Sequence, residues 1–183
     1  MFETLASNNQ LISLIKNGGV AVLRTDTLYG IVASADDPEA VERVYAIKQR
    51  DPNKSCIILL ADPSASYDHS DELAHDIEMY HETPTSFLIA SPDAPRWLLR
   101  ENDELAYRVP ANKSLRALLR QTGPLIAPSA NPEGELPAKN IEEAKAYFGD
   151  AVDMYVDDGD VPVDTPPSRL LRIHPDGSQE QLR

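Results

Sequence analysis

The stretch Val20-Ala-Val-Leu-Arg-Thr-Asp-Thr-Leu-Tyr-Gly30 is the segment around which the rest of the chain is interpreted. Its first half is apolar and β-branched, which predicts a buried strand over residues 20–24. A polar turn follows, and a second short apolar run covers residues 31–34. Small hydroxyl residues at the end of a buried strand lie where open α/β sheets bind ligands. Taken alone, the stretch favours an ordinary strand-to-turn junction, so other segments must supply the evidence for a site.

Length and composition predict one soluble globular domain, residues 1–183, with 42% hydrophobic and 26% charged residues. No apolar run has membrane-spanning length, and the N-terminus lacks the basic region and apolar core of a signal peptide. The single cysteine, Cys56, precedes an apolar run, so we expect a buried structural thiol and no disulfide. These features together predict a cytoplasmic protein without a membrane partner.

The charge distribution favours a small anionic ligand over a polymer. The formal net charge is -13, and an acidic surface repels nucleic-acid backbones. Basic residues nevertheless gather in one stretch, with Arg43, Lys48, Arg50 and Lys54 close together. We therefore expect a local basic pocket in an acidic protein.

Helical and strand patterns alternate along the chain. Short apolar strands are predicted at 20–24, 31–34, 56–60, 85–89, 105–109, 125–127, 153–156, 169–173 and 179–182. Helices are predicted between most of them, including one capped by Asn112 and one that begins near Asn140. Residues 48–54 are predicted to form a polar loop and 91–104 a proline-containing connection. The order is not strictly βαβ, so we expect an α/β fold with a twisted mixed (parallel and antiparallel) sheet flanked by helices.

Four polar segments adjoin these strands: residues 25–29, the spacing Lys48-x-Arg50-x-x-x-Lys54, Arg108, and Ser129-x-Asn131. Lysine and arginine two positions apart can clasp phosphate oxygens from two sides. A Ser-x-Asn turn supplies a hydroxyl, an amide and backbone N–H groups to an anion. Singly, each segment fits a plainer interpretation: a solvated loop, an arginine at the rim or paired with a carboxylate, and a capping turn.

Standard nucleotide and metal motifs are missing. The chain contains no G-x-x-x-x-G-K-[ST], no G-x-G-x-x-G and no G-x-S-x-G. His69, His75 and His81 are six residues apart, which does not match one helix face, so we expect no protein-held metal.

Six short motifs in order resemble the YrdC-like (TsaC) family. Thr25-Asp-Thr-Leu-Tyr-Gly30 resembles its P-T-[DE]-x-x-[YF]-G signature, and Lys48 to Lys54 its K-x-R-x-x-x-K segment. The remaining matches are Pro84 to Ile89, Ala106-Tyr-Arg-Val-Pro110, Pro128-Ser-Ala-Asn131 and Pro167-Ser168. The resemblance runs from about Gly18 to Arg172 and is that of the short, single-domain type.

The resemblance implies a threonylcarbamoyl-AMP synthase, a nucleotidyltransferase. Such an enzyme joins L-threonine, bicarbonate or carbon dioxide, and ATP, and releases pyrophosphate. Partner proteins of the threonylcarbamoyl-transfer machinery then modify an adenosine in tRNA, which this chain would meet only indirectly or weakly. The implied fold is a twisted α/β sheet around a deep basic cavity, with Mg²⁺ carried mainly by the ATP phosphates.

The resemblance also implies roles for individual residues. ATP would be held by Lys48, Arg50, Tyr29, Ser129 and Asn131, with Lys48 and Arg50 contributing most to catalysis. Threonine would meet a second set of side chains, namely Thr27, Lys54, Arg108 and Ser168. Lys54 fits either substrate.

The chain departs from the family pattern at four places: Arg24, residues 81–84, residues 132–134 and Arg169. The alternatives therefore stay open. One is a YrdC-like paralogue that binds a nucleotide or RNA in the same cavity without synthase activity. The other is a carbamoyl-transfer module of the hydrogenase-maturation kind, which normally lies in a much larger chain with zinc-finger cysteines.

Overall fold

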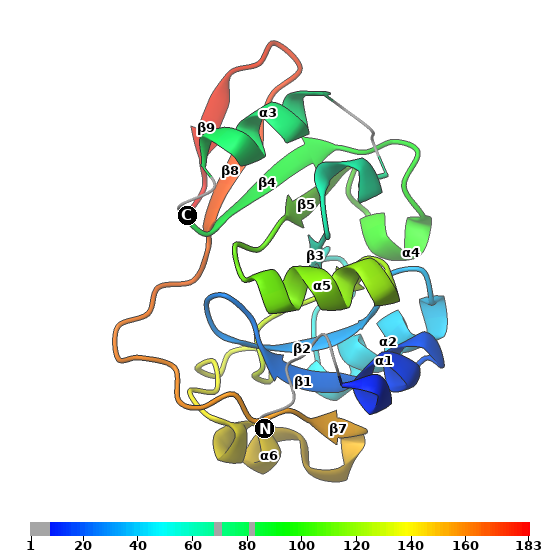
Figure 1. Cartoon of the computed structure of the whole chain (residues 1–183). Coiled ribbons are helices and arrows are strands. Elements are labelled where there is room, and N and C mark those ends of the chain that lie inside the picture. Colours follow the sequence, from blue (N-terminus) through cyan, green and yellow to red (C-terminus); the bar gives the residue numbers. More distant parts are fainter. Residues whose placement is uncertain (1–7, 68–70, 81–82) are drawn as a thin grey trace.

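The computed structural model describes residues 8–67, 71–80 and 83–183. Within these residues the strands form one sheet in the order β7-β1-β2-β6-β3-β5-β4-β8-β9 (Figure 1). The strands are β1 (Ala21–Arg24), β2 (Tyr29–Ser34), β3 (Ile57–Leu59), β4 (Thr85–Ala90), β5 (Glu104–Arg108), β6 (Leu125–Ile126), β7 (Met154–Tyr155), β8 (Arg169–Ile173) and β9 (Gln179–Gln181). The helices are α1 (Asn9–Lys16), α2 (Pro38–Lys48), α3 (Asp71–Met79), α4 (Arg96–Leu99), α5 (Lys113–Thr122) and α6 (Ile141–Phe148).

The sheet mixes both pairing directions, as the sequence predicts. β1 and β2 form an antiparallel hairpin, whereas β7 runs parallel to β1. β5 is parallel to β3 and antiparallel to β4, and β4 is parallel to β8. The predicted mixed α/β fold is therefore confirmed.

Side-chain caps fix where the helices begin. Asn112 Oδ1 accepts hydrogen bonds from the backbone N–H groups of Ser114 and Leu115, and Asn140 Oδ1 accepts one from that of Glu143. Such caps satisfy N–H groups that have no partner inside the helix. Both predicted helix starts are confirmed.

Side chains on the two faces of β1 pack into two different parts of the hydrophobic core. Ala21 and Leu23 pack in a cluster with apolar residues of α1 and α5, while Val20 and Val22 belong to a larger cluster that includes residues of α2 and α6. The strand is buried because successive side chains point to opposite covered faces. Cys56 is buried in the larger cluster, as predicted.

Two local predictions are wrong. The predicted connection 91–104 contains the short helix α4, which buries Leu98 and Leu99 in the core. Lys48, predicted in a loop, is the last residue of α2, and Gln49 ends the helix in a left-handed conformation with φ 52°. The periodic apolar pattern of α4 is too short to be recognised in sequence.

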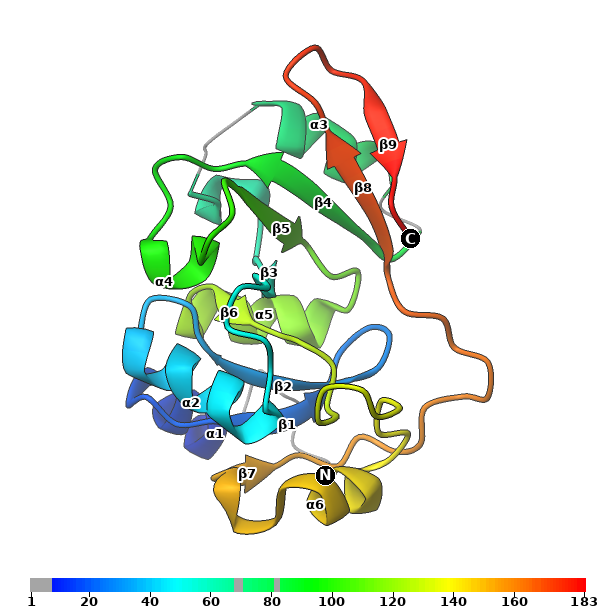
Figure 2. The same ribbon diagram turned by 180° about the vertical axis from the view of Figure 1, so that it is seen from behind.

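Arg108 of β5 and Ser86 of β4 are polar residues that lie on one face of the sheet, near the same end of these two paired strands. Because side chains alternate along a strand, Ala106 and Arg108 share a face of β5, and Ser86 and Leu88 share a face of β4. The register places Leu88 opposite Ala106 and Ser86 opposite Leu170. The segment between β7 and β8 runs outside the sheet beside this region, as both views show (Figures 1 and 2).

Candidate active site

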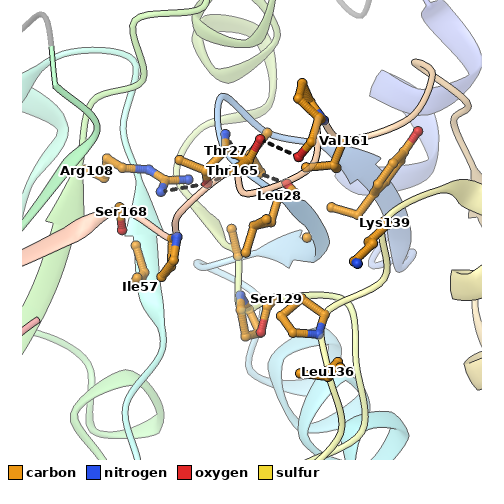
Figure 3. A pocket seen from close by; sticks show the side chains of 18 of the residues that line it. Thr27, Leu28, Ile57, Arg108, Ser129, Leu136, Lys139, Val161, Thr165 and Ser168 are labelled. Carbon is orange, nitrogen blue, oxygen red and sulfur yellow. Dashed lines mark hydrogen bonds between the residues drawn. The ribbon is translucent and has the colours of Figure 1, made fainter.

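A cavity of about 510 Å³ lies where the β1–β2 turn, the end of β5 and the segment between β7 and β8 meet (Figure 3). Its cationic lining residues are Arg108, Lys139 and Arg183, against one acidic residue, Asp164. The rest of its lining is Thr25, Thr27, Leu28, Tyr29, Gly30, Ile57, Ala127, Pro128, Ser129, Leu136, Pro137, Val161, Pro162, Thr165, Pro167 and Ser168. The balance of charged lining residues favours an anionic ligand.

Arg108 provides a buried positive charge at one end of the cavity. It is the last residue of β5 and is 4% exposed. Its Nη2 lies 3.2 Å from Asp26 Oδ1, and its Nη1 donates a long hydrogen bond of 3.4 Å to Thr27 Oγ1. Burial lowers the pKa of the Arg108 guanidinium, and the nearby Asp26 carboxylate opposes this shift.

The Arg108 guanidinium retains unused hydrogen-bonding capacity. Within the described part of the chain, its buried Nε has no hydrogen-bond partner. Leaving a buried donor unsatisfied is costly, and buried polar atoms normally have partners. The guanidinium also offers a planar fork that matches a carboxylate. This end of the cavity is therefore suited to a ligand that carries a carboxylate.

Hydroxyl groups surround the same end of the cavity. Thr25 and Thr27 are both buried, and their Oγ1 atoms lie 3.3 Å apart. Thr25 also closes the β1–β2 turn, because its hydroxyl donates to the Leu28 carbonyl at 2.8 Å. In Figure 3, Ser168 lies on the same side of the pocket as Arg108 and Thr27. Its Oγ is 3.0 Å from that of Ser86, the neighbouring polar residue of β4.

Tyr29 lines the cavity while its hydroxyl fixes a distant turn. The side chain is fully buried, and its OH donates to the Gly159 carbonyl at 2.8 Å and accepts from the Asp158 N–H at 3.1 Å. Burial raises the pKa of this phenol, so it stays a neutral donor at physiological pH. The Tyr29 hydroxyl is therefore engaged within the protein, by the turn that contains Asp158 and Gly159.

A second cavity of about 440 Å³ adjoins the first. The two share Ile57, Pro128, Ser129 and Arg183. Further basic lining residues of the second cavity are Arg50, Lys54 and Arg172, against one acidic residue, Glu104. Two adjacent cavities that share lining residues can hold two substrates side by side.

Lys48 lies behind these cavities and lines neither of them. It is 2% exposed, and its ammonium donates to the backbone carbonyls of Ser129 and Asn131. Burial, with a smaller contribution from the Arg50 charge, lowers the pKa of Lys48 to about 8. The lysine thus holds the Ser129–Asn131 turn in place, whereas the resemblance implies a direct contact with ATP phosphates.

Arg50 and Lys54 reach the second cavity from the loop after α2. Arg50 Nη2 donates to the Ser55 carbonyl at 2.9 Å, which folds the loop back on itself. Lys54 Nζ forms a 2.5 Å ion pair with Glu133 Oε1. Arg43, by contrast, pairs with Asp153 and lines neither cavity, so Arg50 and Lys54 are the residues of the basic stretch that line the second cavity.

The Ser129–Asn131 turn is internally braced. Ser129 Oγ donates to Asn131 Oδ1 at 2.6 Å, and the Asn131 amide donates to the carbonyls of Pro132 and Glu135. Ser129 lines both cavities, and Asn131 is buried behind it. The predicted site residues are thus brought to one region, in which Lys48 and Asn131 support the lining from behind.

Comparison with known proteins now identifies the family. The Sua5/YciO/YrdC family model, described as telomere recombination, matches residues 13–183. The chain belongs to the Sua5/YciO/YrdC family. It is 31% identical to the threonylcarbamoyl-AMP synthase of Pseudoalteromonas translucida, over 80% of this chain and 83% of that protein.

Solved structures of the Sua5/YciO/YrdC family have the same fold. E. coli YciO matches with a TM-score of 0.79 and 27% identity, over 96% of this chain and 87% of that one. P. abyssi Sua5 complexed with L-threonine matches with a TM-score of 0.83 and 23% identity, over 94% of this chain. This chain spans about half of that Sua5 chain, 52% of its length.

The sequence motifs missed several lining residues of this Sua5/YciO/YrdC domain. Lys139 lies on the opposite side of the pocket from Arg108 (Figure 3). Arg183 is remote in sequence, yet its Nε donates to the Ser168 carbonyl at 3.0 Å. Residues of the segment between β7 and β8, such as Val161 and Thr165, complete the wall. The predicted strands 169–173 and 179–182 were the sequence signal that could have brought Arg183 near Ser168.

The departures from the family pattern have structural explanations in part. Arg24 Nη1 donates to the Asp158 carbonyl at 3.2 Å, so it braces the turn that Tyr29 also binds. The Arg169 guanidinium lies 5.4 Å from the centre of the Tyr80 ring, a cation–π contact. Residues 81 and 82 lie outside the described residues.

No helix in the described part of the chain is both long and apolar enough to cross a membrane.

Proposed function

We propose that this protein is a threonylcarbamoyl-AMP synthase. It joins L-threonine, bicarbonate or carbon dioxide, and ATP, and its products are threonylcarbamoyl-AMP and pyrophosphate. The observation that carries the proposal is the Arg108 end of the cavity, where a buried guanidinium with an unpaired Nε lies beside the Thr27 hydroxyl. The similarity to the threonylcarbamoyl-AMP synthases of Pseudoalteromonas translucida and Marinobacter nauticus supports it.

Threonine occupies the Arg108 end in this proposal. The guanidinium binds the amino-acid carboxylate, and the hydroxyls of Thr27 and Ser168 bind its polar groups. An arginine fork holds a carboxylate in one orientation, which leaves the threonine amine to face the rest of the cavity. Lys54, which fits either substrate by its motif, is assigned to the nucleotide because it lines only the second cavity.

ATP occupies the basic second cavity and the shared wall. Arg50 and Lys54 meet its phosphates, and Ser129 lies between the nucleotide and threonine. Lys48 and Asn131 act through the turn that they brace. The Tyr29 ring packs on the nucleotide from the first cavity. Apolar lining residues are common in ligand sites, where a few polar groups fix orientation.

The reaction has two bond-forming steps. The threonine amine attacks carbon dioxide and loses a proton, which yields a carbamate. A carbamate oxygen then attacks the α-phosphorus of ATP, and pyrophosphate leaves with the electrons of the broken P–O bond. The protein contributes alignment and positive charge, because no dedicated base is needed once the carbamate has formed.

Mg²⁺ is proposed to enter with ATP. Among the described residues there is no group of three or more His, Cys, Asp or Glu side chains that could hold a metal ion. Mg²⁺ often binds through substrate phosphates and waters with few protein ligands, and it neutralises charge on the departing pyrophosphate. The product serves proteins of the tRNA threonylcarbamoyl-transfer machinery in the cytoplasm, so tRNA is met only indirectly.

One assay tests the proposal. The protein is incubated with ATP, Mg²⁺, bicarbonate and labelled L-threonine, and threonylcarbamoyl-AMP is sought by mass spectrometry. We expect pyrophosphate release that depends on threonine and bicarbonate, and an Arg50→Ala variant slower by about 100-fold. Nucleotide binding without product at high enzyme concentration would instead favour the paralogue without synthase activity.

A further inference from the structure

Glu133 connects the loop after α2 to the Ser129–Asn131 turn. Its Oε1 pairs with Lys54 Nζ at 2.5 Å, and its Oε2 accepts the Asp51 backbone N–H at 2.5 Å. Its own N–H donates to the Lys48 carbonyl at 2.9 Å. The Lys54 hydrogen bond, followed by that from the Asp51 N–H, lowers the pKa of this carboxyl. Glu133 is therefore a carboxylate at neutral pH.

This carboxylate contacts one of the cations that line the second cavity. Lys54 and Arg50 line the second cavity, whereas Glu133 lines neither cavity. The Lys54 ammonium, whose side chain is 57% exposed, already has two anionic partners before any ligand arrives, Glu133 at 2.5 Å and the more distant Asp51 at 4.0 Å. A phosphate that enters the cavity must therefore share this ammonium with Glu133.

We propose that Glu133 sets the affinity of the cavity for phosphate chains by competing for Lys54. This inference rests on the proposed function, in which the second cavity holds the ATP phosphates. The competition weakens the binding of ATP and of pyrophosphate, which present the same chemistry to Lys54. Product release limits turnover in many enzymes, so a weaker hold on pyrophosphate favours its departure. Threonine, bound at the Arg108 end, is unaffected.

The sign of the effect follows from charge. Removal of a carboxylate beside Lys54 and Arg50 strengthens their attraction for an anion, whereas loss of a needed scaffold would weaken it. Because the pair is partly exposed, we expect a gain of about three- to fivefold in affinity. The gain must shrink in high salt, since solvent-exposed charges are screened.

Isothermal titration of ATP and of inorganic pyrophosphate into Glu133→Gln tests the proposal. Glutamine can still accept a hydrogen bond from Lys54 or Asp51, so the loop is retained while the charge is lost. Glu135→Gln is the matched control, because it removes the same charge from an exposed residue two positions along the same loop. We expect about three- to fivefold tighter binding of both anions to Glu133→Gln only, with threonine affinity unchanged.

A double-mutant cycle assigns the effect to the pair. In a Lys54→Met background, Glu133→Gln should change ATP affinity by less than about 1.5-fold, because the contested ammonium is gone. Unchanged or weaker ATP binding by Glu133→Gln, while the unmodified protein binds ATP, would overturn the inference and leave the synthase proposal standing. Failure of every variant and of the unmodified protein to bind ATP would overturn both.

Discussion

The two ends of the joined cavities are built differently. At the Arg108 end the charged group is 4% exposed and is held by Asp26 and Thr27 on the β1–β2 turn. At the other end Lys54 lies on a loop, with 57% of its side chain exposed and a carboxylate partner in Glu133. The first end is positioned by strands, whereas the second rests on a loop, and loops are in general more mobile than the strands and helices that they connect.

This difference suggests a division of labour. A small amino acid has few groups to recognise, so its site benefits from side chains fixed in advance, which reduces the entropy lost on binding. A phosphate chain is long and highly charged, and it must leave as pyrophosphate after the reaction. Loop cations with alternative partners suit a ligand that must first be held and then released.

The largest expected effect tests the Arg108 end. Arg108→Lys keeps a positive charge for Asp26 but loses the planar fork, so threonine loses its oriented carboxylate contact. We expect kcat/KM for threonine to fall by about 100-fold, whereas KM for ATP changes by less than about threefold. Steady-state kinetics with each substrate varied in turn gives both values. An equal loss for both substrates would contradict the division.

A second prediction concerns Lys48, which supports the Lys54 end from behind. Its pKa of about 8 in the folded chain lies below the ordinary lysine value, so the unfolded chain binds more protons between about pH 8 and 10.4. Stability contributed by this group therefore rises with pH in that window. Relative to Lys48→Met, the free energy of unfolding should rise by about 2 kcal/mol from pH 7 to 9.5.

Urea unfolding of both proteins at the two pH values checks this. Lys48→Met is the right reference because methionine fills similar space and does not titrate. Other groups titrate alike in both proteins, so their effects cancel in the difference. If the free energy of unfolding changed equally with pH in both proteins, the Lys48 ammonium would not be desolvated in the folded chain, which would contradict the structure.

The smallest expected effect separates the ring of Tyr29 from its hydroxyl. Tyr29→Phe removes the bonds to Gly159 and Asp158 but leaves the ring that lines the cavity. We expect the free energy of unfolding to fall by about 1 kcal/mol, with KM for ATP changed by less than about threefold. Thermal unfolding and steady-state kinetics measure the two quantities. A tenfold rise in KM for ATP would instead place the hydroxyl on the nucleotide.

The sequence predicted which segments form the site better than it predicted how their side chains are arranged there. Thr27 and Arg108 were singled out because polar residues interrupt buried strands, a local pattern, whereas Ser168 was proposed only from the family resemblance. The resemblance assigned Lys48 to the ATP phosphates, because a sequence motif shows which residue types occur but not where their side chains point. In the structure its ammonium turns toward two backbone carbonyls.

The residues that sequence missed depend on long-range packing. Arg183 reaches the cavity because β9 folds back on β8, which brings it to Ser168. Lys139 and Val161 come together through a backbone hydrogen bond between two irregular segments, 2.7 Å from the Val161 nitrogen to the Lys139 oxygen. Irregular segments carry no periodic signal, so the contact between Lys139 and Val161 could not be predicted from local pattern.

Equilibrium binding of each substrate alone to Arg108→Lys and to Arg50→Ala tests the division of the cavity most directly. Isothermal titration with L-threonine and with ATP gives four affinities, and thermal unfolding confirms that both variants fold. We predict that Arg108→Lys loses at least about 30-fold in threonine affinity but less than about threefold in ATP affinity. Arg50→Ala should show the reverse. Equal losses of both ligands in both variants would contradict two separate ends within one site.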